Sequence, residues 1–141
     1  MRTTLYLAAM NSSRPLIRLE EIAESLDIPR HFLAKILKRL AKEGVLVSVK
    51  GPNGGFGTSR HTLQTPLLKI LEMTGQSDKA DSCVLLQGKC DPEKLCALHP
   101  YAAPVKNQWM QLLSETTIGL ILKKEQPAAV HMAMLLAPLH D

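Results

Sequence analysis

Apolar residues recur at helical spacing in two adjacent segments near the start of the chain. Residues 19–26 and 29–43 each hold four of them at i, i+3, i+4 and i+7, with polar residues between. The two sets are Leu19, Ile22, Ala23, Leu26 and Leu33, Ile36, Leu37, Leu40. Both segments are predicted to be amphipathic helices, and Gly44 ends the second. Their short connection at Asp27-Ile28-Pro29 indicates a helix-turn-helix, with any small helical hairpin as the alternative.

A short apolar run and a glycine-rich turn follow the second helix. Residues 45–49 have β-strand character, residues 50–55 form the turn, and Phe56 starts a return strand. A hairpin in this position is a wing. Its four glycines between positions 51 and 57 let the backbone approach a phosphate or a minor groove closely. A phosphate-binding loop of an enzyme is the competing interpretation, but the Walker pattern is absent.

Three further helices are predicted. One covers residues 3–10, and another covers residues 65–74 with Gly75 as its stop. The third is a single long helix over residues 101–122, whose apolar residues have no obvious cover within the chain. These residues are Val105, Trp109, Leu112, Leu113 and Ile121. Pairing with the same helix of a second subunit is the favoured explanation.

The expected fold is therefore mainly α: a winged helix-turn-helix domain with a small β wing, plus a long C-terminal dimerisation helix. The expected division is a DNA-binding domain over 1–75, a cysteine-rich loop over 76–100, the dimerisation helix over 101–125 and a tail of unknown role over 126–141. The 141 residues are 45% hydrophobic and 4% aromatic, which indicates an aliphatic globular core. No apolar run reaches the roughly 18 residues of a membrane helix, so a cytoplasmic protein without membrane contact is expected.

Positive charge is concentrated in the first half of the chain. Residues 1–61 hold ten Lys and Arg against five acids, and all six arginines lie there. This distribution favours a nucleic-acid surface over its alternative, a solvated helix face. In the major groove we expect Arg30, His31, Lys35, Lys38 and Arg39. In the wing and just after it, Lys50, Asn53, Gly54 and Arg60 are expected to contact the adjacent backbone.

All three cysteines fall in one polar stretch, Cys83-x6-Cys90-x5-Cys96, and His99 follows. An odd number of cysteines in a cytoplasmic protein argues against a disulfide framework. The spacing lacks the tight pairs of a zinc knuckle and is loose enough to wrap an iron-sulfur cluster. A mononuclear zinc site, redox-active thiols and inert cysteines remain open as alternatives.

These motifs together resemble the IscR/NsrR-type winged-helix regulators over roughly residues 1–122. The matching segments are Ile22-Ala23-Glu24, Ile28-Pro29, Phe32-Leu33, Ile36-Leu37, Lys50 to Phe56, the cysteine loop with His99, and Glu115-Thr116-Thr117. The chain departs from the family in three places. It lacks a stretch usually found before Arg2, so either it is shortened or its natural start lies upstream. Its first cysteine spacer is longer than usual, and Gly57 replaces a larger residue.

The resemblance implies a homodimeric bacterial transcription repressor that binds a palindromic operator in double-stranded DNA and is not an enzyme. It implies that a 2Fe-2S or 4Fe-4S cluster controls DNA affinity, with Cys83, Cys90 and Cys96 as thiolate ligands and His99 as the fourth. The alternatives are a winged-helix regulator whose cysteines bind zinc or are redox-active, a constitutive DNA-binding protein, and a small thiol or zinc enzyme using His99 as base. The enzyme is the weakest of these because no orienting acid follows His99.

Overall fold

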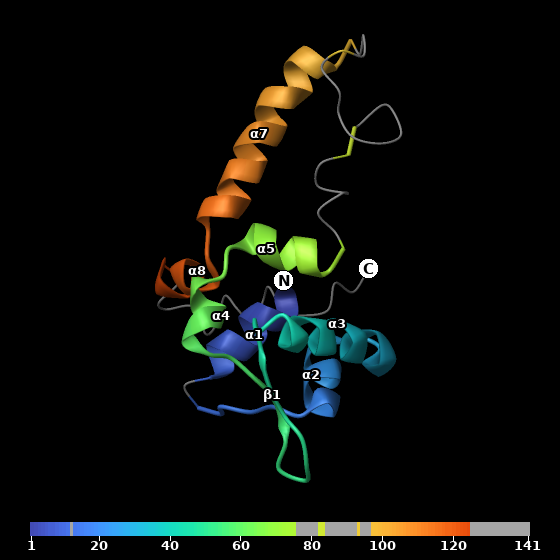
Figure 1. Cartoon of the computed structure of the whole chain (residues 1–141), viewed down its shortest axis with the longest axis vertical. Helices are drawn as coiled ribbons and strands as arrows, with labels where there is room; N and C mark the ends of the chain where they lie inside the picture. Colours follow the sequence, from blue (N-terminus) through green and yellow to red (C-terminus); the bar gives the residue numbers. More distant parts are fainter. Residues whose placement is uncertain (12, 76–81, 84–92, 94–96, 125–141) are drawn as a thin grey trace.

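The computed structural model describes residues 1–11, 13–75, 82–83, 93 and 97–124. In these residues the chain forms helices and one two-stranded antiparallel hairpin (Figure 1). The elements in chain order are α1 (Arg2–Met10), α2 (Leu19–Leu26), α3 (Arg30–Lys42), β1 (Val47–Val49), β2 (Gly55–Gly57), α4 (Arg60–Gln64), α5 (Leu67–Met73), α7 (His99–Glu115) and α8 (Ile118–Lys124). This architecture confirms the mainly helical winged fold.

One aliphatic core joins the helices that surround α1. The apolar faces predicted for α2 and α3 point into it, together with side chains from α1, α5, α7 and α8. Its fully buried members include Leu7, Ile17, Ile22, Leu26, Leu33, Leu37, Leu40, Ile70, Leu113 and Ile118. Burial of one such side chain stabilises the fold by about 1.5–3 kcal/mol. The packing therefore fixes which face of α3 is left for solvent.

The two glycines predicted to end helices do so. Gly44 follows α3 with a φ of +75°, and Gly75 follows α5 with a φ of +71°. Both angles lie in the left-handed region, where only glycine escapes a steric cost from Cβ. After Gly44 the chain reverses, and the Val45 amide donates to the Leu40 carbonyl at 2.9 Å. This turn sends the chain from the end of α3 into the wing.

The prediction of a single long helix over residues 101–122 is wrong in one respect, because this part of the chain forms two helices, α7 and α8. The chain between α7 and α8 is extended and pairs with the segment before α5. The Leu67 amide donates to the Thr116 carbonyl at 2.9 Å, and the Ile118 amide donates to the Thr65 carbonyl at 3.4 Å. These tertiary hydrogen bonds replace helical ones and fold α8 back against α1 and α4. No helix among the described residues has the length and hydropathy to cross a membrane.

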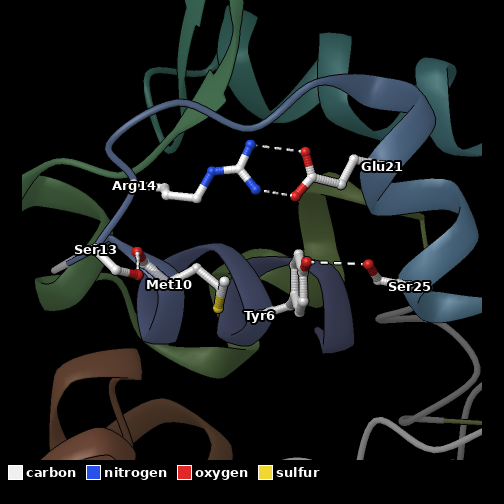
Figure 2. Close-up of polar contacts among 6 residues, drawn as sticks. All are labelled: Tyr6, Met10, Ser13, Arg14, Glu21 and Ser25. Atoms are coloured by element: carbon white, nitrogen blue, oxygen red, sulfur yellow. Dashed lines mark hydrogen bonds and ion pairs between the residues drawn. The ribbon is translucent and has the colours of Figure 1, made fainter.

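Helix α1 and the segment that follows it are tied to α2 by polar contacts that Figure 2 shows. The Arg14 guanidinium makes a two-pronged ion pair with Glu21, in which Nη2 lies 2.9 Å from Oε2. Hydrogen bonding to Glu21, and then its charge, raise the pKa of Arg14 above its ordinary value. The Tyr6 hydroxyl lies 3.1 Å from that of Ser25. Arg14 is thus engaged within the fold, and it orients the first helix of the helix-turn-helix.

Candidate nucleic-acid interface

The exposed face of α3 carries a row of basic side chains. Because Leu33, Leu37 and Leu40 are fully buried, helical geometry points the opposite face into solvent. That face holds His31, Lys35, Lys38 and Lys42, at i, i+4, i+7 and i+11, and all four are exposed. We call these four residues the basic row. Three of them were predicted, and Lys42 could have been found because it stands four residues after Lys38.

Arg30 and Arg39 were predicted to share this face; both are exposed, but they lie outside the basic row. Arg30, the first residue of α3, forms an ion pair with Glu20 of α2. The pair connects the two helices of the motif and offsets part of the positive charge. Nη1 of Arg39 lies 4.0 Å from the position that a Cβ on Gly75 would occupy. Arg39 therefore reaches toward the end of α5, beside the basic row and not within it.

Besides Lys42, Phe32 is an exposed residue of α3 that was not among the predicted DNA contacts. It lies in the first turn of α3 and is 52% exposed, although apolar residues of this size are usually covered. An aromatic ring at this position can make apolar contact with a thymine methyl group in the major groove. The sequence could have indicated this exposure only because Phe32 does not belong to the set Leu33, Leu37 and Leu40, whose spacing marks the buried face of the helix.

The wing is a short hairpin whose turn requires glycine. Val47 pairs with Gly57, and Val49 pairs with Gly55. Gly51 has a φ of +111°, and a Cβ on Gly54 would lie 2.2 Å from the Val49 carbonyl oxygen. Both positions thus exclude larger residues. The predicted contact residues at the tip, Lys50 and Asn53, are exposed, and Gly54 is half-buried.

The base of the wing is attached to the chain that enters α2. Ile17 and Phe56 exchange two backbone hydrogen bonds, of 2.9 and 2.8 Å. A Cβ on Gly57 would lie 2.1 Å from the Pro15 carbonyl oxygen, so the two segments are in direct backbone contact. This contact gives a physical reason for glycine at position 57. The wing projects from the core at the end of the molecule opposite α7 (Figure 1).

Arg60 lies apart from the basic row. It is the first residue of α4, it is exposed, and it lines a groove between α4 and α8 that also includes Gly119 and Lys123. Figure 1 shows α4 and α3 on opposite sides of α1. The structure therefore does not bring Arg60 together with the α3 residues, and its contact with DNA stays a prediction.

Of the four predicted cluster ligands, the described residues include Cys83 and His99. Both are partly buried, and His99 is the first residue of α7. The Lys106 ammonium donates to the Ser82 carbonyl at 3.3 Å, which holds the chain next to Cys83 against the second turn of α7. Cys90 and Cys96 lie outside the described residues. Within the described part, no group of three potential ligands forms.

Helix α7 extends away from the core (Figure 1), and exposed apolar side chains form a stripe along it. The apolar stripe consists of Tyr101, Val105, Trp109 and Leu112, which are 76%, 65%, 50% and 49% exposed. Their spacing of four, four and three residues places them on one face of the helix. Two residues predicted to lack cover are in fact covered. Leu113 is 1% exposed, in the part of the chain where α7 packs against α5, and Ile121 packs against the core because α8 folds back after the break at Thr116.

A helix-turn-helix with an exposed basic row, followed by a glycine-dependent wing, defines the class of winged-helix DNA-binding regulators. The chain belongs to the Rrf2 family, described as iron-dependent transcriptional regulators, which it matches over residues 1–124. The predicted resemblance to regulators of the IscR type is confirmed.

Individual relatives agree with this assignment. An HTH-type transcriptional regulator of Aquifex aeolicus is 36% identical over 120 residues, which cover 84% of this chain and 83% of that protein. The regulator IscR of Cronobacter sakazakii is 25% identical over 126 residues, which cover 88% of this chain and 76% of that protein. The structure of CymR, the global cysteine regulator of B. subtilis, superimposes with a TM-score of 0.67 at 17% identity, covering 87% and 89%. The similarity to CymR, at this low identity, shows that the two chains share a fold.

Proposed function

We propose that this chain is a homodimeric repressor whose affinity for a palindromic operator depends on an iron-sulfur cluster. The observation that carries the proposal is the placement of three surfaces on one molecule. The basic row and the wing supply phosphate and base contacts, the apolar stripe of α7 supplies a dimer interface, and the chain at Cys83 lies against the start of that same helix. Relatives that are transcriptional regulators support regulation over catalysis.

The basic row would enter the major groove as the recognition surface. The ammonium groups of Lys35, Lys38 and Lys42 would bind phosphates, and this attraction is independent of the DNA sequence. His31 and Phe32, in the first turn, are the groups suited to reading base edges. Lys50 and Asn53 at the wing tip would contact the neighbouring backbone. Two such surfaces in a symmetric dimer match the two halves of a palindrome.

The apolar stripe on α7 would be covered by the same stripe of a second copy. A symmetric dimer places the same patch of each subunit against its partner. Four large apolar residues, all about half exposed or more, would otherwise remain in contact with water along one helix face. Leu113 and Ile121 are excluded from this interface because they belong to the subunit's own core.

The donor set of the cysteine loop fits an iron-sulfur cluster. Cys83, Cys90 and Cys96 would hold it as thiolates, with His99 as the fourth ligand, and thiolates with imidazole are established ligands of such clusters. When bound, the cluster supplies a group that oxidation, nitric oxide or iron shortage can alter. The chain contributes the link from Ser82 to Lys106, which connects the loop to the dimer helix. A change at the loop can thereby bias the spacing of the two DNA-binding domains.

An absorption spectrum of the protein purified under anaerobic conditions tests the cluster. We expect absorption in the visible range that disappears in Cys90→Ser, while Asn107→Ser on α7 keeps it. Zinc in place of the cluster would give a colourless protein whose metal is detected by elemental analysis. A colourless, metal-free protein that still binds DNA would instead identify a regulator without a cluster. Either result would contradict this part of the proposal.

A further inference from the structure

The wing has little stability of its own. Each of its strands has three residues, and Val47, Ser48 and Val49 are all exposed. An isolated two-stranded hairpin is marginal in water, because too little apolar surface is buried to offset the ordering of the chain. The bonds between Ile17 and Phe56 hold the base of the wing, and these leave the tip at residues 50–54 to be positioned in another way.

One side chain from outside the wing holds its tip. Arg18 Nη2 donates to the Pro52 carbonyl at 2.8 Å, across 34 residues of sequence. Pro52 is the second residue of a β-turn in which the Gly54 amide donates to the Gly51 carbonyl at 2.9 Å. The turn fixes the direction of the Pro52 carbonyl, so a bond to that oxygen restrains the whole tip. Lys50 and Asn53 stand on either side of it.

Arg18 is also the residue from which α2 begins. It is the N-cap of that helix, and the Ile22 amide donates to its carbonyl at 3.1 Å. Its backbone is therefore fixed to the helix-turn-helix while its side chain is fixed to the wing. Within the described part of the chain, the bond to Pro52 is the one side-chain hydrogen bond of Arg18, and it has no ion pair there.

We propose that Arg18 is a positioning residue that clamps the wing tip to the start of α2 and so holds Lys50 and Asn53 in place for DNA. This inference rests on the proposed role of the wing in DNA binding. The planar guanidinium suits the role, because several donors in a fixed plane reach a carbonyl at the end of a long side chain. A lysine at this position would keep the charge but lose that geometry.

The test combines two variants of Arg18 with one of Lys50. The probe is a short labelled duplex selected by the wild-type protein from random-sequence DNA, and binding is measured by fluorescence anisotropy. Arg18→Met and Arg18→Lys are each expected to weaken binding by about fivefold, the scale of one typical intramolecular hydrogen bond. In a Lys50→Gln background, Arg18→Met should cost less than about twofold, because contacting groups that act together are not additive. Lys123→Gln, which removes the same charge on α8, should bind as the wild type does.

Two results would overturn the clamp. If Arg18→Lys binds fully and the effects of Arg18→Met and Lys50→Gln add, Arg18 touches phosphate directly and positions nothing. The second result comes from the free protein: NMR order parameters of the Asn53 and Gly54 amides should fall in Arg18→Lys, and unchanged values would refute the restraint itself. This second measurement needs no DNA, so it separates failure of the clamp from failure of DNA binding by the protein.

Discussion

Replacing Val105 by aspartate tests the dimer interface at its most exposed aliphatic position. Val105 is 65% exposed in the isolated chain, so covering it in a dimer would contribute about 1–2 kcal/mol in each subunit. In a symmetric dimer the substitution acts twice, and it adds two aspartate charges that lose water without gaining a partner. A total loss of about 4 kcal/mol corresponds to a dissociation constant about a thousandfold higher.

Asn107→Asp is the matched control for this experiment. Asn107 is exposed on α7, and two residues further along a helix lie about 200° around the axis, away from the apolar stripe. It therefore introduces the same charge into the same helix outside the proposed interface. Sedimentation velocity at micromolar concentration should show dimers for the wild type and for Asn107→Asp, and folded monomers for Val105→Asp. Circular dichroism checks that the monomers keep their helices. A dimeric Val105→Asp protein, or a monomeric wild type, would refute this interface.

Three further predictions concern the DNA surface, the wing and the cluster. Lys38→Gln and Lys50→Gln should each weaken binding to all sequences and lower the slope of log affinity against log salt by about one; an unchanged slope would remove that lysine from the phosphate contacts. Gly57→Ala should lower the free energy of unfolding by about 2 kcal/mol or more, because its Cβ would meet the Pro15 carbonyl oxygen at 2.1 Å, and thermal denaturation measures the loss. His99→Ala should weaken retention of an anaerobically reconstituted cluster; an unaltered spectrum and lifetime would assign the fourth ligand elsewhere.

The parts of the fold that local patterns determine were predictable. Apolar spacing located α2 and α3, since one buried face is enough to define an amphipathic helix. Gly44 and Gly75 marked helix ends because the left-handed backbone needs glycine there. The basic row followed from the same spacing, because whatever is opposite Leu33, Leu37 and Leu40 must face solvent.

The features that were missed depend on tertiary contacts or on very short elements. Helix α4 has five residues and begins at a capping box in which Thr62 replaces the usual Glu or Gln, so no periodicity reveals it. The break between α7 and α8 depends on the tertiary pairing of Pro66 with Thr117, and its one local signal is Thr117, whose hydroxyl accepts from the Leu120 amide at 3.2 Å as an N-cap of α8. The burial of Leu113 follows from the packing of α7 against α5, and the position of the Arg39 side chain near Gly75 is equally non-local.

The most direct test of cluster-controlled repression measures DNA affinity with and without the cluster in one protein. The anaerobically prepared wild type is titrated against its selected duplex, then treated with nitric oxide until the visible absorption is lost, and titrated again. Cys90→Ser provides a cluster-free reference that has never held the group. We expect tight binding only while the visible absorption persists, and weak binding for the treated protein and for Cys90→Ser alike. Equal affinity in all three preparations would contradict control by the cluster and leave a DNA-binding protein whose cysteines have another role.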